Sequence, residues 1–224
     1  MVAWGLARSG VGGPDMKCSS SVAGRIVNIL AAGRRLMDYP LESREGLPDA
    51  LRVLLKDYPR EAWENHDSFS ALIRFWLERH LMFRRLLEAL ESETVRALEG
   101  NMEARLYVAR LSRYGSLFVG ELHGHHMVED THYFPQLKPL EANLVAGFDI
   151  LDRDHHAIDG HLERFTNDAN AIFHAVGDKG DWKAATGDFR TGLQHLTQFL
   201  DRHLVDEEEL VVPVLLKHTP MGIT

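Results

Sequence analysis

The stretch LHGHHMVEDTHYFPQL (122–137) decides the fold prediction, because its chemistry returns later in the chain. Within it, His125 is followed four residues later by Glu129, and Glu129 is followed six residues later by Pro135. The segment FLDRHLVDEEELVVPVL (199–215) repeats this spacing with His203, Glu207 and Pro213. Residues four apart in a helix lie on one face, one turn apart. The repeat therefore predicts two helices that each present a His–Glu pair on one side.

Outward from these two stretches, four long segments carry apolar residues at helical spacing, with almost no alternation of the kind typical of strands. Short polar separators that contain glycine or proline lie between them. Long helices joined by short loops must lie antiparallel to their neighbours. The sequence predicts an all-α fold, an up-down-up-down four-helix bundle, with helices over roughly 67–93, 102–138, 143–176 and 182–217.

The first 60 residues differ from the rest, because they hold much of the glycine and proline punctuation. Only short helix-like pieces interrupt it, at Val22–Leu36 and Pro48–Asp57. We therefore expect an N-terminal extension over residues 1–60, partly helical, and the bundle over residues 61–224.

Histidine is unusually frequent, with 13 residues in the chain, and each predicted long helix carries one on its apolar stripe. These four are His80, His125, His155 and His203. His80 and His155 also lie in similar local sequences, so the chain reads as two copies of a helix pair. A pseudo-two-fold axis between the copies would bring both His–Glu pairs to one site.

A metal centre is the chemistry that this pattern favours. A buried carboxylate is unfavourable unless a cation or a hydrogen-bond partner compensates it. Glutamate and histidine from facing helices hold two iron or manganese ions in other bundles, and nitrogen and oxygen ligands suit iron, manganese or zinc. The alternative is that Glu129 and Glu207 are salt-bridged structural residues and the histidines are ordinary half-buried ones. The doubled pattern favours the metal.

Other residues near the pattern receive structural interpretations. The acidic run 206–209 is expected to be mostly a solvated face, with only Glu207 on the side of His203. Trp76 is expected to be a core aromatic residue. Pro135 and Pro213 are expected to bend or end the two His–Glu helices just past the site.

Four segments together resemble the hemerythrin-like, HHE cation-binding family: 78–90, 122–137, 152–162 and 199–215. The similarity extends over about residues 65–218. It implies a four-helix bundle that holds a non-haem di-iron centre. The ligands that the resemblance implies are His80, His125, Glu129, His155, His203 and Glu207.

One position departs from the oxygen-carrying members of that family. Where those proteins have a second histidine one turn after the third-helix ligand, this sequence has Asp159, so the resemblance implies a carboxylate as the seventh ligand. His126 is the alternative candidate for this position. The departure argues against simple reversible carriage of oxygen.

Composition excludes several other classes. A net charge of −8 would repel a phosphate backbone, so we expect no nucleic-acid partner. The single cysteine, Cys18, excludes an internal disulfide and a cysteine zinc site. No apolar stretch is long enough to span a membrane, and the first 15 residues lack the features of a secretory signal. We therefore expect a cytoplasmic protein.

The expected function is that of a metal-binding protein whose non-haem di-iron site binds or senses O2, NO, peroxide or iron. Manganese or zinc are the alternative metals. One competing hypothesis is a di-iron or di-manganese oxidoreductase, and another is a structural bundle with zinc or a single ion. The sequence leaves open whether the chain is an enzyme and whether it forms a homodimer.

Overall fold

The computed structural model describes residues 39–218. The helix expected at Val22–Leu36 lies outside this range. All regular secondary structure in the described residues is helical, and they contain no strand. The prediction of an all-α protein is confirmed.

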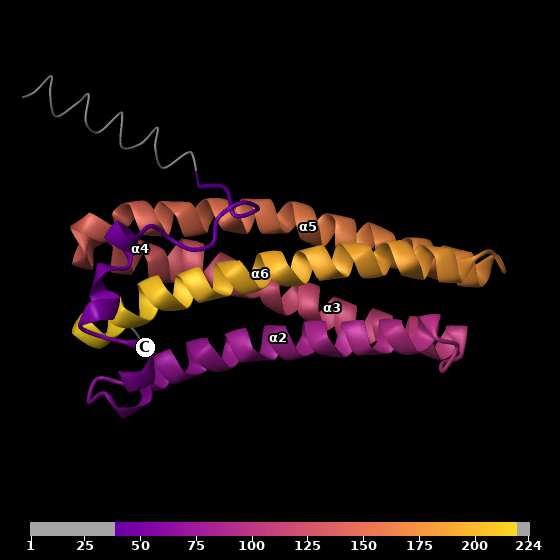
Figure 1. Ribbon diagram of the computed structural model, residues 1–224, viewed down its shortest axis with the longest axis horizontal. Helices are drawn as coiled ribbons and strands as arrows, with labels where there is room; N and C mark the ends of the chain where they lie inside the picture. Colours follow the sequence, from indigo (N-terminus) through magenta and orange to yellow (C-terminus); the bar gives the residue numbers. More distant parts are fainter. Residues whose placement is uncertain (1–38, 219–224) are drawn as a thin grey trace, which may run out of the picture. The chain divides into compact units, whose positions relative to one another are not determined.

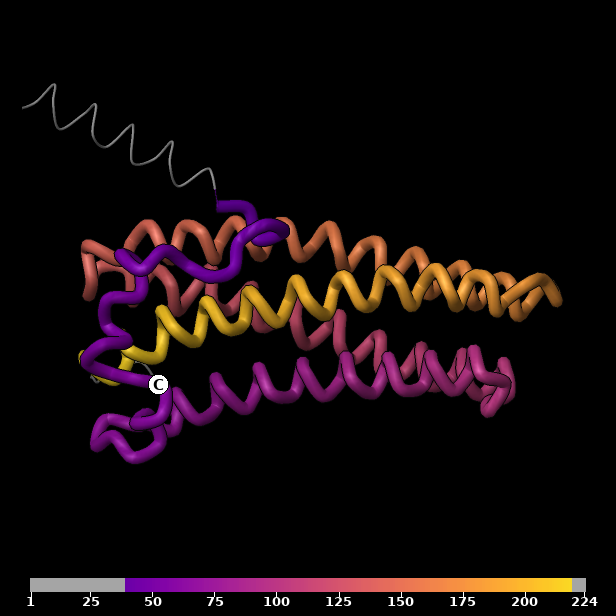
Figure 2. The backbone as a smooth tube through the Cα atoms, in the orientation of Figure 1, coloured from indigo at the N-terminus to yellow at the C-terminus, as the bar shows by residue number. Residues whose placement is uncertain are grey.

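Four long helices dominate the described part of the chain (Figure 1). They pack in a ring, since α2 contacts α3, α3 contacts α5, α5 contacts α6 and α6 contacts α2. Their colour gradients show that consecutive long helices run in opposite directions (Figure 2). The bounds are Ala71–Leu98 for α2, Ala104–Val128 for α3, Val145–Gly177 for α5 and Trp182–His218 for α6.

Local chemistry explains where α2 begins and ends. The Ser70 hydroxyl accepts a hydrogen bond from the Ile73 backbone N–H at 3.3 Å, as an N-cap residue does. At the other end, Gly100 adopts a φ of 79°, a left-handed conformation that glycine tolerates best. The helix therefore starts and ends a few residues later than the apolar periodicity alone indicated.

The second predicted helix is not continuous. The α-helical part α3 ends at Val128 and gives way to a π-helix, η4, over Glu129–Tyr133. The chain then forms α4 (Phe134–Leu137) and two 3-10 turns, η5 (Lys138–Leu140) and η6 (Ala142–Leu144). Pro135 lies at the start of α4, where its missing N–H is tolerated. Pro213, in contrast, lies inside α6, which continues past it, so the expectation that it could end the helix is wrong.

Residues 39–65 form part of the same compact unit as the long helices, since that unit extends from Tyr39 onward. The helix expected at Pro48–Asp57 is instead two 3-10 turns, η1 (Asp49–Leu51) and η2 (Val53–Lys56). A third turn, η3, covers Arg60–Asn65. This segment buries five large apolar side chains, which are Leu41, Leu47, Leu51, Leu54 and Trp63.

The interior of the helical ring changes character along its length. Toward the end where α2 finishes and α3 begins, it is apolar, with buried side chains such as Leu90, Leu111 and Phe189. Toward the other end it contains buried histidines and carboxylates. None of the described helices is long and apolar enough to cross a membrane.

Candidate metal centre

Two groups of potential metal ligands lie inside the polar end of the ring. Within each group, one ligand atom from every residue lies within 4.8 Å of the others. The four-residue group consists of His80 on α2, His125 on α3, Glu129 at the start of η4, and Glu207 on α6. The three-histidine group consists of His126 on α3, His155 on α5 and His203 on α6.

The two glutamates connect the groups. Glu129 places Oε1 at 3.0 Å from His125 Nε2 and Oε2 at 3.7 Å from His155 Nε2. Glu207 places Oε1 at 3.5 Å from His80 Nε2 and Oε2 at 3.4 Å from His203 Nε2. Each carboxylate therefore directs one oxygen to each group, the arrangement that a bridging ligand needs.

Many atoms at this centre have no hydrogen-bond partner among the described residues, which is unusual for buried polar atoms. The atoms concerned are both oxygens of Glu129, Oε2 of Glu207, both ring nitrogens of His126, and Nε2 of His155 and of His203. Buried polar atoms without partners are strongly destabilising unless something compensates them. Cations between the two groups would do so, and the residues present therefore fit metal ions.

The pKa values of the two glutamate carboxyls are shifted in opposite directions. Burial raises the pKa of Glu129 well above its ordinary value, and the nearby negative charge of Glu207 raises it further. Burial acts in the same direction on Glu207, but His80 and His203 outweigh it and hold the pKa of Glu207 well below its ordinary value. Without metal, the proton that the pair retains therefore belongs to Glu129.

The histidines also differ from one another. Burial lowers the pKa of His125 to about 3 and that of His126 well below its ordinary value. Both rings are therefore neutral at pH 7, the form in which histidine binds metal. Burial lowers the pKa of His203 as well, but its contacts with Asp154 and Glu207 outweigh this and raise the pKa to about 9.

Carboxylates hold the outer nitrogen, Nδ1, of three histidines. Glu208 Oε1 lies 3.0 Å from His80 Nδ1 and Asp130 Oδ1 lies 2.8 Å from His155 Nδ1. Asp154 Oδ2 lies 3.3 Å from His203 Nδ1. A carboxylate in this position orients the ring and leaves the opposite nitrogen free for a metal.

Arginines neutralise the outer carboxylates. Arg60 and Arg84 donate to Glu208 at 2.7 and 2.8 Å. Burial raises the pKa of Glu208, but His80 and Arg84 outweigh burial and bring that pKa to about 2. Arg44 donates to Asp154 at 2.9 Å through Nη1 and to Asp206 at 2.8 Å through Nε.

The expectation that the acidic run 206–209 is mostly a solvated face is wrong. Asp206, Glu207 and Glu208 are at most 2% exposed. The reason is that α6 is covered on several sides, by α2, α5, α4 and the turn η2, and that each acid has a cation or a histidine beside it. Trp76 is buried as expected, but its indole N–H also donates to Glu207, so it does more than fill the core.

Sequence reasoning missed the outer carboxylates Asp130, Asp154 and Glu208. A signal for two of them was present in the repeat, because an acidic residue follows each of the two glutamates, as Asp130 and as Glu208. Each contacts the histidine on the first helix of the other helix pair, His155 and His80 respectively.

The structure brings together every candidate ligand except Asp159. The side chain of Asp159 is 51% exposed, and its Oδ1 lies 3.8 Å from Nδ1 of His123, which is also exposed. The expectation that Asp159 shares the inner face of His155 is wrong, because Ile158 takes the buried position on that turn of α5. His126 lies in the site instead, only 4% exposed, with its ring stacked on His155 at a centroid distance of 4.0 Å.

A family comparison agrees with this geometry. The model of the hemerythrin HHE cation binding domain matches residues 71–215, which include both ligand groups. The chain belongs to this hemerythrin family. Comparisons with curated proteins and with solved structures found no match. The resemblance to this family that the sequence indicated is confirmed. Arg44 and Arg60, which donate hydrogen bonds to the outer carboxylates, precede the matched residues.

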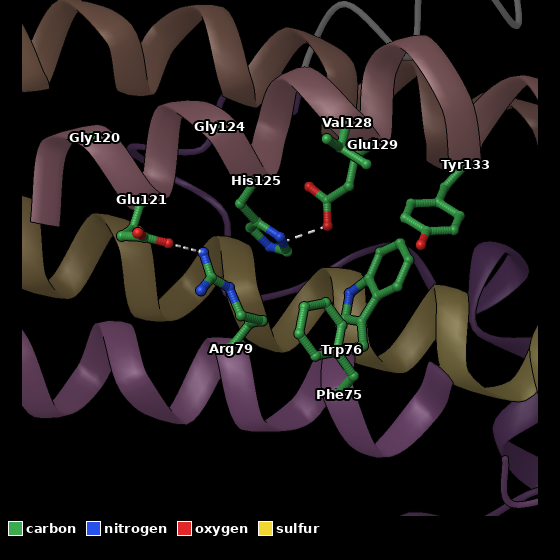
Figure 3. Close-up of a pocket in the computed structure, with 10 residues that line it drawn as sticks. All are labelled: Phe75, Trp76, Arg79, Gly120, Glu121, Gly124, His125, Val128, Glu129 and Tyr133. Carbon is green, nitrogen blue, oxygen red and sulfur yellow. Dashed lines mark hydrogen bonds and ion pairs between the residues drawn. The ribbon is translucent and has the colours of Figure 1, made fainter. Parts of the chain in front are cut away.

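A cavity of about 400 Å³ in the hemerythrin domain reaches the four-residue group between α2 and α3 (Figure 3). His125 and Glu129 line it from α3 and η4, while Phe75 and Trp76 face them from α2. The three-histidine group contributes no residue to its lining. A small molecule in this cavity would therefore meet the four-residue group first.

Proposed function

We propose that this chain is a hemerythrin-type, up-down-up-down four-helix bundle that binds two metal ions, one at each ligand group. The observation that carries the proposal is the orientation of Glu129 and Glu207, each of which directs one oxygen to each group. A single ion would leave buried unpartnered atoms uncompensated at the other group, which are ring nitrogens at the three-histidine group and glutamate oxygens at the four-residue group.

Iron is the metal that we propose. Five imidazoles and two carboxylates offer nitrogen and oxygen donors without sulfur, which suits iron or manganese. Structural zinc needs only four ligands in a tetrahedron, so one zinc ion would not use this set. Manganese is the alternative for the same donors.

The ligand that we propose is a small molecule such as O2, NO or peroxide, and the role is binding or sensing. Bound metal ions would supply an open coordination position and, for iron, electrons for this chemistry. The protein contributes the rest: Asp130, Asp154 and Glu208 orient three histidines, and the cavity beside His125 admits the ligand.

Metal analysis of the full chain tests the proposal. Protein purified from cells grown with added iron should contain about two irons per chain, as a site with two sets of N/O ligands requires. Glu129→Ala and Glu207→Ala should each lower the iron content sharply, because each removes a carboxylate shared by both groups. His174→Ala and His218→Ala are the matched controls and should leave it unchanged. One zinc without iron, or equal iron in all four variants, would contradict the proposal.

A second measurement separates a binder from an oxidoreductase. The reduced, iron-loaded protein is exposed to oxygen without any reductant, and its visible spectrum is followed through removal of the oxygen. Return to the starting spectrum supports binding or sensing. Loss of the reduced state, with steady consumption of an added reductant, supports the oxidoreductase instead.

A further inference from the structure

The cavity between α2 and α3 is far larger than a diatomic ligand needs. Its volume of about 400 Å³ lies within the usual range of small-molecule pockets, roughly 300–1,000 Å³. Such pockets combine an apolar lining with a few polar groups that fix orientation. This one has that composition, since aromatic side chains face His125 and Glu129 across the open space (Figure 3).

Aromatic rings make up the apolar wall. Trp76 and Tyr133 lie with their ring centroids 5.0 Å apart at an angle of 59°, and Phe75 is 56% exposed beside them. Flat rings at an angle leave faces and edges on which another ring can stack. The lining is therefore suited to a flat, aromatic molecule.

The opposite wall is open because α3 carries two glycines there, one turn apart. A Cβ atom added to Gly120 or to Gly124 would meet no other atom within 4 Å. Packing within the protein therefore does not require glycine at either position. A larger side chain at either position would instead occupy part of the cavity that these residues line.

The charges at the rim cancel. Arg79 on α2 forms an ion pair with Glu121 on α3 across the cavity, and its guanidinium also lies over the rings of Phe75 and Phe83 at 5.9 and 5.6 Å. An anionic ligand would have to displace Glu121 from Arg79, which is the one arginine or lysine among the described residues that line the cavity. The cavity therefore favours a neutral molecule.

We propose that this cavity binds a neutral molecule with a single aromatic ring, stacked among Phe75, Trp76 and Tyr133 and in reach of the four-residue group. Its role as a substrate or modulator of a metal reaction rests on the proposed function. Its binding does not, because none of the contacts that carry the argument involves a metal.

Phenol is the probe and benzoate its charged counterpart. Binding of each to the full chain, with and without iron, is measured by calorimetry and by ligand-detected NMR. Phenol should bind both forms, and in the iron-free protein benzoate should bind at least about tenfold more weakly, because it must displace Glu121 from Arg79. Equal affinities for the two in the iron-free protein, or no phenol binding to either form, would overturn the proposal.

Cavity-filling variants locate the binding site. Gly124→Leu should weaken phenol binding at least about tenfold by occupying the cavity, and Gly120→Leu serves as a second variant should the first fail to fold. Gly160→Leu, at an exposed glycine of α5 with equally open surroundings, is the matched control and should bind phenol as the unmodified chain does. Unchanged binding in the folded α3 variants would overturn the proposal. Loss of iron with retained, glycine-dependent phenol binding would instead contradict only the proposed function.

Discussion

His126 is buried among the candidate ligands although the apolar stripe of its helix passes through His125 instead. It lies next to His125, and neighbouring residues on a helix normally point about 100° apart. Both nevertheless face the interior, because α3 packs against both α2 and α5: His125 contacts His80 on α2, and His126 stacks on His155 on α5. The stacking of His126 on His155 and its depressed pKa keep a neutral ring at the three-histidine group.

Replacing His126 should therefore affect metal binding, and replacing Asp159 should not. His126→Ala removes one of three imidazoles from its group, and we expect the iron content to fall toward about one ion per chain. Asp159→Ala removes only an exposed carboxylate beside His123 and should leave iron content and visible spectrum unchanged. Metal analysis of both variants decides. If Asp159→Ala lost iron while His126→Ala kept it, the assignment of the three-histidine group would be wrong.

At the scale of elements, apolar periodicity was sufficient to predict the four long helices but not the interruption after α3. The apolar stripe continues through Phe134 and Leu137, both buried, so it gives no sign of the π-helix between them and Val128. A π-helix inserts an extra residue and is often found at functional sites. Here it begins at Glu129, whose position depends on partners from other helices that a local pattern does not contain.

The buried acidic run could not be predicted for a related reason. Periodicity assigns one side of a helix to solvent, but residues 210–216 of α6 are buried on every side. Residues 39–65 supply part of this cover, through η2 and through Arg44, Arg52 and Arg60. The His–Glu repeat was sufficient to predict four of the seven residues in the two groups, and the histidines on the apolar stripes added His80 and His155, because both patterns are local in the sequence. The arginine partners were not predictable, because they come from a segment without a repeat.

Tyr107 links two of the long helices, and its buried hydroxyl should make the free energy of unfolding depend on pH. Its hydroxyl lies 3.0 Å from Thr94 Oγ1, so α3 is linked to α2 at the apolar end. Burial raises the pKa of Tyr107 to about 12, although the hydrogen bond to Thr94 opposes this. An unfolded tyrosine loses its proton near pH 10. Its contribution to stability is therefore complete below about pH 10 and is lost as the pH rises toward 12, by up to about 3 kcal/mol.

Tyr107→Phe should reveal this effect when its free energy of unfolding is compared with that of the unmodified chain at two pH values. At about pH 8 the variant should be less stable by about 1 kcal/mol, because the hydrogen bond is lost. At about pH 11 the deficit should shrink or reverse, because phenylalanine has no proton to lose. Urea unfolding at the two pH values measures both free energies of unfolding. A deficit that stayed constant would show that the Tyr107 hydroxyl titrates normally.

At the scale of the whole described chain, the metal centre and residues 39–47 share one polar network. Asp154 contacts His203 on one side and Arg44 on the other. Arg44 also contacts Asp206, which accepts a hydrogen bond from the Leu47 backbone N–H at 3.1 Å. The segment that carries Arg44 precedes the hemerythrin domain. It therefore contributes to a centre whose proposed ligands all lie within that domain.

Metal removal should consequently lower the Tm of the protein. The size of this change should depend in part on Arg44. A ligand that binds only the folded state at about a thousand times its Kd stabilises it by roughly 4 kcal/mol, which corresponds to about 10 °C in Tm for a chain of this size. We expect iron loading to raise Tm by about that amount. Arg44→Gln loosens Asp154 and with it His203, and a loss of this kind lowers metal affinity by about 10–100-fold.

The gain in Tm on iron loading should therefore be smaller in Arg44→Gln than in the unmodified chain, by roughly a third to two thirds, as a 10–100-fold loss of affinity requires. Arg52→Gln is the matched control, because Arg52 lies in the same part of the chain and also contacts an acid of α6, Glu209 at 3.0 Å, but reaches no histidine of either group. It should lower the Tm of both forms while leaving the gain intact. Thermal unfolding of each variant, with and without iron, measures the gain directly. Equal gains in the two variants would show that the N-terminal arginines support only the fold, and that the network through Asp154 ends before the metal ligands.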